Sequence, residues 1–278
     1  MTWYSLRVES AAHRDEAMAA LFAAGAQGVE EVGSALATSF PDEAGARAAL
    51  AAVMAVDSAA ACNIEPTDSL DWSVAWRDHA RLVTLGSLVI APPWLAEDLD
   101  PVTSIVIDPG MAFGTGDHAS TRGAVLMLQE AMREGMTVAD LGSGSAVLSI
   151  AAAKLGASRV WAIEVDPEAQ GNAGENVVRN DVAGVVHLLE GDASVLLPIV
   201  APVDVITANI ISSVIKELLP GMGAALNPGG FAVLAGILDS EKDEMIDFLR
   251  RTGWTLRNTY VEEEWWSALV QRPSQHSS

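Results

Sequence analysis

A turn of small residues between a predicted strand and a predicted helix is the strongest candidate for a ligand site in this sequence. Residues 137–156 read TVADLGSGSAVLSIAAAKLG, in which Asp140, Gly142, Gly144 and Ala146 are spaced two apart. Glycine lets a ligand approach the backbone closely, and the first turn of the following helix has N–H groups without intrahelical partners. The turn therefore predicts a small-molecule site at the end of the strand.

The spacing of the turn separates two kinds of nucleotide-derived ligand. A dinucleotide-binding turn has the pattern G-x-G-x-x-G, and its third glycine would fall at Val147. A bulky β-branched residue there argues against a pyrophosphate on the helix end and against an NAD-dependent oxidoreductase. The pattern D-x-G-x-G-x-small instead resembles motif I of the class I methyltransferases, which bind S-adenosylmethionine. Ala146 replaces the usual third glycine of that motif.

Carboxylates follow the next two predicted strands. Glu164 ends the second strand, where it can accept hydrogen bonds from both ribose hydroxyls, because neighbouring strand ends meet at the switch point of the sheet. The resemblance implies that Asp192, after the third strand, accepts from the adenine amino group, and an N-cap or turn role explains it equally well. Asp166 is expected to cap the helix that begins at Pro167. Asp140, Glu164 and Asp192 thus lie at the ends of three successive strands, and together they fit one adenosyl ligand.

The fourth strand ends with TANII, which places Asn209 at the same edge of the sheet. Methyltransferases that act on nucleobase or amide nitrogens usually carry Asn-Pro-Pro-Tyr here. In this sequence Ile210 and Ile211 follow the asparagine. This departure argues against a nucleobase or glutamine-amide substrate.

The composition favours a globular chain with an acidic surface. It has 37 acidic and 16 basic residues, a formal net charge of −21, and no cluster of Lys and Arg. Such a surface repels nucleic acid and suits a basic protein partner or a cationic small molecule, although the charge also serves solubility. There is no membrane-spanning apolar run, no signal peptide, a single cysteine and no metal-ligand spacing. We therefore expect a cytoplasmic protein without a metal.

The hydrophobic pattern divides the chain into three parts. Residues 1–66 are expected to form a ferredoxin-like βαββαβ domain, with a hairpin turn at Gly33 and Ser34. Residues 67–92 are expected to form a connector, with Trp72 and Trp76 on one helix face and a hairpin following them. Residues 93–278 are expected to form the S-adenosylmethionine-dependent methyltransferase domain.

In residues 93–278 predicted strands and helices alternate, which indicates a parallel sheet with crossover connections. The fold class is therefore α/β: a seven-stranded Rossmann-like class I methyltransferase domain preceded by a small α+β domain. After a first short strand at 104–107, the expected strands are 138–141, 159–165, 185–189, 203–208, 231–235, 255–260 and 266–271, the last two antiparallel. The expected helices are 121–132, 147–155, 167–178, 213–226 and 240–251.

Several motifs together resemble the PrmA family, the methyltransferases of ribosomal protein L-eleven. They are DPGMAFGTGDHAST, DLGSGSAVLSIAAAKLGA, AIEVDPEA, DVITANI, NPGGFAVLAGIL and EEEWWSALVQR. The first of these, at residues 108–121, is the least common and carries most of the resemblance. Asp117, Ala119 and Ser120 depart from the family's usual Thr, Pro and Thr, and Ser143 from its usual Cys.

The resemblance implies roles for residues of the 108–118 loop. The loop would cover the cofactor, with Phe113 and Thr115 beside its methionine end. His118 would accept a proton or fix the loop. Acceptors such as the side-chain oxygen of Asn209 and nearby backbone carbonyls would suit the substrate amine without a dedicated base, and Asn209 is also expected to contact the cofactor. A lysine amine has a reference pKa of about 10.4, so its neutral form costs roughly 4–5 kcal/mol at neutral pH and the site must desolvate it.

The function expected from these observations is methylation of lysine or N-terminal amines of ribosomal protein L-eleven, a basic protein of the large ribosomal subunit. The protein is expected to act as a monomer and to recognise its substrate through residues 1–66. Two alternatives remain open. One is a lysine methyltransferase of another protein, and the other is a module that binds the cofactor without transferring its methyl group.

Overall fold

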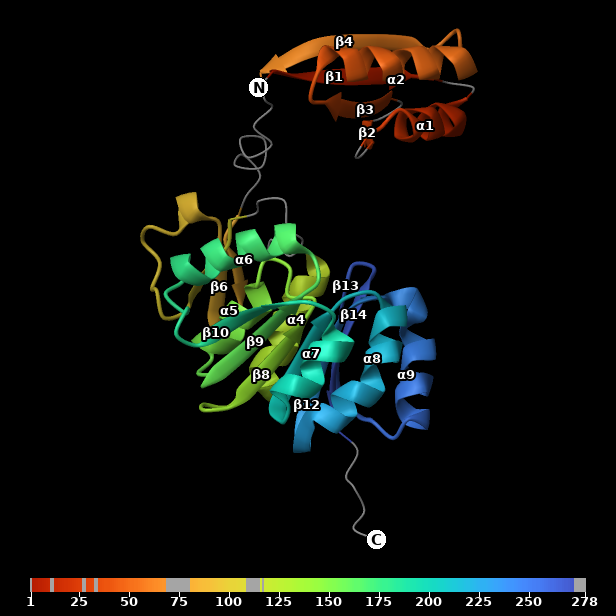
Figure 1. The fold of residues 1–278 in the computed structure, drawn as a ribbon. Helices are drawn as coiled ribbons and strands as arrows, with labels where there is room; N and C mark the ends of the chain where they lie inside the picture. The colour runs from red at the N-terminus through yellow and green to blue at the C-terminus, as the bar shows by residue number, and fades with distance from the viewer. Residues whose placement is uncertain are drawn as a thin grey trace. The chain divides into compact units, whose positions relative to one another are not determined.

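The computed structural model describes residues 2–10, 13–26, 29–32, 35–68, 81–108, 116 and 118–272. The chain divides into two compact units, Met1–His79 and Ala80–Ser278 (Figure 1). The second unit thus begins within the stretch expected to be a connector, and it includes the hairpin of that stretch. The expected helix face of Trp72 and Trp76 lies outside the described residues, as does the turn at Gly33 and Ser34.

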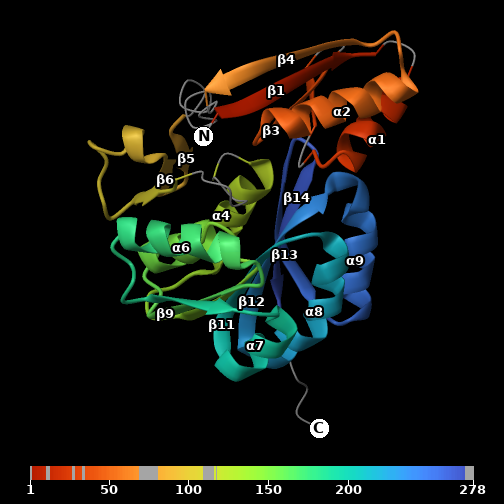
Figure 2. The same ribbon diagram turned by 45° about the horizontal axis from the view of Figure 1, so that its top comes forward.

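The first unit is an antiparallel four-stranded sheet covered by two helices, in the order β-α-β-β-α-β. Figure 2 shows both helices on one face of this sheet. The strand order is β2-β3-β1-β4, and apolar side chains such as Leu6, Leu36 and Val53 are buried in its core. The elements are β1 (Thr2–Glu9), α1 (Arg14–Ala23), β2 (Glu30–Val32), β3 (Ala35–Phe40), α2 (Glu43–Val56) and β4 (Ala61–Asp68).

The second unit is built on a seven-stranded sheet with the order β10-β9-β8-β11-β12-β14-β13. The first five of these strands are parallel, while β14 runs antiparallel between β12 and β13. The central strands are buried on both faces, which explains their nearly continuous apolar runs. The strands are β8 (Thr137–Leu141), β9 (Arg159–Glu164), β10 (Val186–Glu190), β11 (Val203–Asn209), β12 (Leu226–Leu238), β13 (Thr255–Glu262) and β14 (Trp265–Gln271).

Helices cover both faces of this sheet, as in a doubly wound fold (Figures 1 and 2). One apolar cluster includes α4 (Ala119–Ala131), α5 (Val147–Lys154) and α6 (Pro167–Arg179). It also includes a small sheet of β5 (Val83–Leu85), β6 (Leu88–Ala91) and β7 (Ser104–Val106). The other cluster includes α7 (Ala193–Val200), α8 (Ser212–Ala225) and α9 (Lys242–Arg251). Two short 3₁₀ turns complete this unit, η1 (Pro93–Leu95) and η2 (Asp239–Glu241).

The expected alternation of strands and helices and the antiparallel pairing of the last two strands are confirmed, with two local differences. Helix α7 was not expected, because it is only eight residues long and contains Pro198. The Asn-Pro-Gly-Gly stretch lies within β12 as a bulge, since Val203 pairs with Leu226 and Val205 already pairs with Phe231. Among the described residues no helix is both long enough and apolar enough to cross a bilayer.

Candidate active site

A cavity of about 570 Å³ lies at the carboxyl ends of the parallel strands. Its wall includes residues from the ends of β8, β9 and β11 and from the turn after β10. The chain moves outward from β8 to β10 and returns to β11 on the other side of β8, so the cavity lies at the switch point of the sheet. A volume of this size is typical of sites for small molecules and cofactors.

The glycine turn after β8 forms one side of the cavity. Gly142 and Gly144 have φ angles of +69° and +50°, a region that glycine adopts without steric cost. A Cβ atom on Gly142 would lie 2.6 Å from Cγ2 of Ile210, so the turn also depends on the absence of a side chain. Ala146 is left-handed as well, with φ +65°, and is the N-cap residue of α5. Because alanine has a Cβ atom, this conformation costs roughly 1–2 kcal/mol, which glycine at this position would avoid.

Glu164, at the end of β9, is joined to the glycine turn. Its Oε2 accepts from the backbone N–H of Gly144 at 2.8 Å. Its Oε1 accepts from the N–H groups of Val165 at 2.8 Å and Asp166 at 3.0 Å. The side chain lines the cavity and is 9% exposed. The backbone thus holds a carboxylate at the position where the sequence places an acceptor for ribose hydroxyls.

Asp140 is buried beneath the turn. Its two oxygens accept from Oγ of Ser149 and Oγ1 of Thr207, each at 2.6 Å. Burial raises the pKa of Asp140, and these two hydroxyl hydrogen bonds offset only part of the effect. The carboxylate therefore joins β8, α5 and β11 from within. Asp140 also contributes to the cavity wall, where a cofactor could contact it. Its expected role in the cofactor site stays a prediction.

Asp192 caps α7, the second of the two interpretations that the sequence allows. Its carboxylate accepts from the N–H of Ser194 at 2.7 Å, and hydrogen bonds from Ser194 lower the pKa of Asp192. Asp192 also lines the cavity, so its capping role is compatible with the expected contact with adenine, which stays a prediction. Asp166 caps α6 in the same way through the N–H of Glu168, as expected.

In the described part of the cavity wall, two polar side-chain atoms are buried without a hydrogen-bond partner. They are Oδ1 of Asn209 and Oγ of Ser143. The amide of Asn209 is oriented by its Nδ2, which donates to Oγ1 of Thr121 at 3.3 Å. An unpartnered buried acceptor costs free energy, so a ligand that donates an N–H to Asn209 would be favoured there. Ser143 was not identified from the sequence as a site residue, although its place between the two glycines of the turn was a usable signal.

Ile210 packs between two glycines, Gly142 and Gly236, and fills the space that a side chain at either position would need. A Cβ on Gly142 would meet its side chain, and a Cβ on Gly236 would lie 2.6 Å from its carbonyl oxygen. Its own N–H donates to the carbonyl of Ala235 at 3.2 Å. These contacts hold the backbone directly after Asn209 and thereby set the position of the asparagine.

His118 begins α4 as its N-cap residue. Its Nδ1 accepts from the N–H of Ser120 at 3.3 Å, and its ring meets the ring of Trp265 edge-on at 4.8 Å. It is not part of the cavity wall. The geometry favours the loop-fixing interpretation, with Nδ1 engaged as a cap. Phe113 and Thr115, the other two expected residues of this loop, lie outside the described residues.

The charge of the cavity wall limits the class of ligand. It includes the carboxylates of Asp140, Glu164, Asp192 and Glu217, and within the described part of the chain it includes no Lys, Arg or His. A pyrophosphate would meet only like charges there, whereas a ligand with a sulfonium and an ammonium group meets opposite ones. The wall therefore fits an S-adenosylmethionine-like ligand better than a dinucleotide.

Comparison with known proteins gives a consistent result. A family model described as "Ribosomal protein L11 methyltransferase (PrmA)" matches residues 8–273. The ribosomal protein L11 methyltransferase of Pelotomaculum thermopropionicum is 39% identical over 230 residues, which cover 80% of this chain and 73% of that protein. The protein of the same name from Chloroflexus aurantiacus is 37% identical over 227 residues, which cover 73% of this chain and 69% of that protein. The crystal structure of ribosomal protein L11 methylase from Lactobacillus delbrueckii subsp. bulgaricus superposes with a TM-score of 0.62 at 31% identity, over 69% of this chain and 99% of that chain.

Proposed function

The chain belongs to the ribosomal protein L11 methyltransferase (PrmA) family, and from this premise we propose that it transfers methyl groups from S-adenosylmethionine to amines of ribosomal protein L11. The proposed acceptors are lysine side chains, the N-terminal amine or both. The observation that carries the proposal is the buried, unpartnered Oδ1 of Asn209 in a cavity lined by carboxylates and bounded by a glycine turn.

The residues present fit this cofactor. Glu164 would accept hydrogen bonds from the ribose hydroxyls, and the backbone of Gly142 and Gly144 would allow the nucleoside to approach closely. The unpartnered hydroxyl of Ser143 adds a polar group to the same wall. When bound, S-adenosylmethionine supplies an electrophilic methyl group on a positively charged sulfur. No described residue of the cavity wall carries a positive charge that would oppose it.

The remaining task of the site is to present a neutral amine. At neutral pH a lysine amine is protonated, and shedding the proton costs roughly 4–5 kcal/mol when its pKa is about 10.4. The apolar side chains of Ile210, Val214 and Leu218 line the cavity and would lower the pKa of an amine by desolvation. Oδ1 of Asn209 would accept an N–H of the neutral amine and so direct its lone pair. The proton would pass to water, because His118 lies outside the cavity wall and its Nδ1 is engaged as a helix cap.

The charge of the chain supports a basic protein as the substrate. A formal net charge of −21 attracts a basic ribosomal protein and repels free nucleic acid. The first unit, with its separate core, is the proposed recognition module for the substrate. We further propose that the protein acts as a monomer in the cytoplasm, where its substrate is synthesised.

Methyl transfer to purified L11 tests this proposal directly. Labelled S-adenosylmethionine is incubated with the enzyme and L11, and in parallel with a second basic ribosomal protein of similar size. Label in L11 alone, located by mass spectrometry on lysines or the N-terminus, is the expected result. Label only in the second protein would contradict the substrate and leave the chemistry intact. Cofactor binding without transfer to any protein of the large subunit would favour a non-catalytic module.

A further inference from the structure

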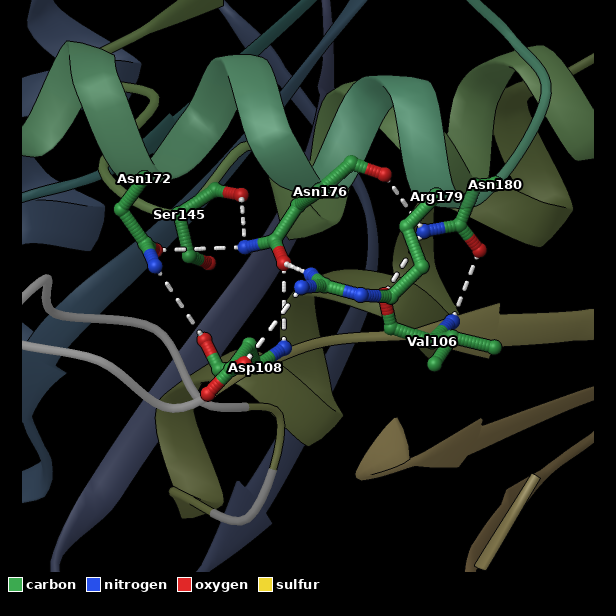
Figure 3. A network of polar contacts seen from close by, with 7 residues as sticks. All are labelled: Val106, Asp108, Ser145, Asn172, Asn176, Arg179 and Asn180. Carbon is green, nitrogen blue, oxygen red and sulfur yellow. Dashed lines mark hydrogen bonds and ion pairs between the residues drawn. The ribbon is translucent and has the colours of Figure 1, made fainter. Parts of the chain in front are cut away.

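Three asparagines follow one another at intervals of four residues along one face of α6, Asn172 and Asn176 within the helix and Asn180 as its C-cap residue. This spacing places their side chains in a row along the helix. Figure 3 shows the row facing the carbonyl of Ser145 in the glycine turn and the backbone at the end of β7. The helix therefore contacts two segments that are distant in the sequence, and one of them, the glycine turn, borders the proposed cofactor site.

Asn176 contacts both of these segments. Its Oδ1 accepts from the N–H of Asp108 at 3.0 Å and from Arg179, and its Nδ2 donates to the carbonyl of Ser145 at 3.1 Å and to Oδ1 of Asn172 at 3.2 Å. These contacts use the full hydrogen-bonding capacity of the amide. The side chain is fully buried, so each lost contact would leave a buried polar group unpaired.

Asn180 makes equivalent contacts that do not reach the turn. Its Oδ1 accepts from the N–H of Val106 at 2.7 Å. Its Nδ2 donates to the carbonyls of Val106 at 2.7 Å and Asn176 at 2.8 Å. It is 4% exposed, so it matches Asn176 in burial as well as in chemistry. Two contacts distinguish Asn176 from Asn180 with respect to the cavity, one to the carbonyl of Ser145 and one from the N–H of Asp108, where the 108–118 loop begins. The second contact uses Oδ1, which an aspartate at position 176 keeps.

We propose that Asn176 is a positioning residue for cofactor binding, an inference that rests on the proposed function. The carbonyl that it holds belongs to Ser145, which lies between Gly144 and Ala146. The N–H of Gly144 binds the carboxylate of Glu164, and Ala146 has the left-handed conformation that starts α5. Asn176 thus holds the peptide group of Ser145, which lies between Gly144, the residue bound to Glu164, and Ala146, the residue that starts α5. Without this contact, a ligand must supply the free energy that orders the turn.

The test compares N176D with N180D. Each substitution replaces an amide NH₂ by a carboxylate oxygen, removes two donated hydrogen bonds and adds one negative charge to the same helix face. In N176D the new oxygen faces the carbonyl of Ser145 and repels it, whereas in N180D the turn keeps its contact. The Kd of S-adenosylhomocysteine is measured by calorimetry on each folded variant, at a temperature well below its melting point.

We expect N176D to bind S-adenosylhomocysteine about five- to tenfold more weakly than the unmodified protein, the size of one lost hydrogen bond. N180D is expected to bind within about twofold of it. Both variants are expected to melt a few degrees lower. A role confined to stability would lower both melting temperatures and leave both Kd values unchanged. Equal affinities of N176D and N180D would therefore overturn the inference and leave the proposed function standing.

Two further measurements keep the outcomes distinct. N172A removes the oxygen that accepts from Nδ2 of Asn176 and should weaken binding in the same direction by a smaller factor, so it replaces N176D if that variant does not fold. Hydrogen exchange of the turn amides should accelerate in N176D and not in N180D. If the unmodified protein does not bind S-adenosylhomocysteine, the proposed function fails, and the inference fails with it.

Discussion

The backbone N–H of Gly144 donates a hydrogen bond to Oε2 of Glu164 across 2.8 Å. The end of β9 is thereby joined to the turn that follows β8, at the cavity. Because one carboxylate contacts the turn and lines the site, a change in Glu164 should affect ligand binding more than it affects the fold.

The first prediction concerns this carboxylate. In E164Q the amide NH₂ meets either the N–H of Gly144 or those of Val165 and Asp166, so one or two backbone donors lose their acceptor. We expect the Kd of S-adenosylhomocysteine to rise about 10- to 100-fold, in line with about 1.5–3 kcal/mol for hydrogen bonds to a charged group. Calorimetry measures this change. E168Q, at an exposed position in the first turn of α6, is the control and should bind normally. Equal affinity in E164Q would contradict the role of Glu164.

A methyl group on Gly142 should damage the turn. G142A places a Cβ 2.6 Å from Ile210 and forces alanine to φ +69°. The expected loss of stability is about 1–3 kcal/mol, measured by urea unfolding, together with weaker binding of S-adenosylhomocysteine. G171A is the matched control, because no atom lies within 4 Å of its added Cβ and it lies inside helix α6. G171A should stabilise the protein by about 0.5–1 kcal/mol. A stable, tightly binding G142A would show that the turn tolerates a side chain.

Removal of the Asn209 side chain should slow methyl transfer. N209A loses the acceptor proposed to direct the amine, and the single-turnover rate is expected to fall about 100-fold, the size reported for a single oriented polar group in other active sites. Rates at saturating cofactor separate this effect from binding. N227A, whose lost contact to Asp204 lies at the amino end of β11, should retain the rate and lose only stability. A normal rate in N209A would exclude Asn209 from the transfer step.

The buried carboxylate of Asp140 should give stability a distinctive pH dependence. Burial raises the pKa of Asp140 above the value of about 3.8 in the unfolded chain, so the folded state binds more protons between these two values. Asp140 therefore destabilises the fold at high pH, and the penalty disappears as the pH falls towards the unfolded value. The unfolding free energy of D140N minus that of the unmodified protein should rise with pH, by at most about 1.4 kcal/mol per pH unit.

Asp204 should change the unfolding free energy with pH in the opposite direction, and it serves as the control. Burial raises the pKa of Asp204, but hydrogen bonds from Thr137 and Asn227 outweigh it, so its pKa lies below the usual value. Its stabilising contribution is present above the unfolded pKa and is lost as the pH falls through the folded one. Urea unfolding of D140N and D204N between about pH 2.5 and 7.5 compares the two, because the window of Asp204 lies at and below its unfolded pKa of about 3.8. A flat difference for D140N would mean that Asp140 titrates alike in both states.

Salt should weaken the proposed encounter with L11. The net charge of −21 accelerates association with a basic protein at low ionic strength, and screening reduces this attraction. We expect the KM for L11 to rise several-fold between about 50 and 300 mM NaCl, while the Kd of S-adenosylhomocysteine changes little. Steady-state kinetics and calorimetry measure the two quantities. A KM independent of salt would indicate that short-range contacts govern recognition of L11.

The sequence was sufficient to predict the cavity, because strands that alternate with helices are parallel and their carboxyl ends meet at one edge. Glu164, Asp192 and Asn209 could therefore be assigned to one site from the sequence alone. The partners of these residues could not be predicted. The hydroxyls that bind Asp140 come from α5 and β11, and such pairings depend on tertiary packing rather than on local pattern.

Short elements were the hardest to predict. Helix α7 has eight residues and a proline, so it is too short to show a helical period in the sequence. Helix capping was nevertheless one of the two roles that the sequence allows for Asp192. The bulge in β12 resembles a turn in the sequence, since Pro228 and two glycines usually end a strand. In the fold the strand resumes after it, because Phe231 pairs with Val205 in the sheet interior.

The packing of Ile210 between Gly142 and Gly236 restricts how this site can diverge. A Cβ on Gly142 would meet the side chain of Ile210, whereas a Cβ on Gly236 would meet its backbone, and both glycines have positive φ angles. A smaller side chain at 210 would therefore relieve only the first of these clashes and would not relieve the backbone strain at either glycine. In laboratory evolution of new acceptor specificity, libraries should keep both glycines and vary position 210, because no substitution at 210 makes room for a side chain at Gly236.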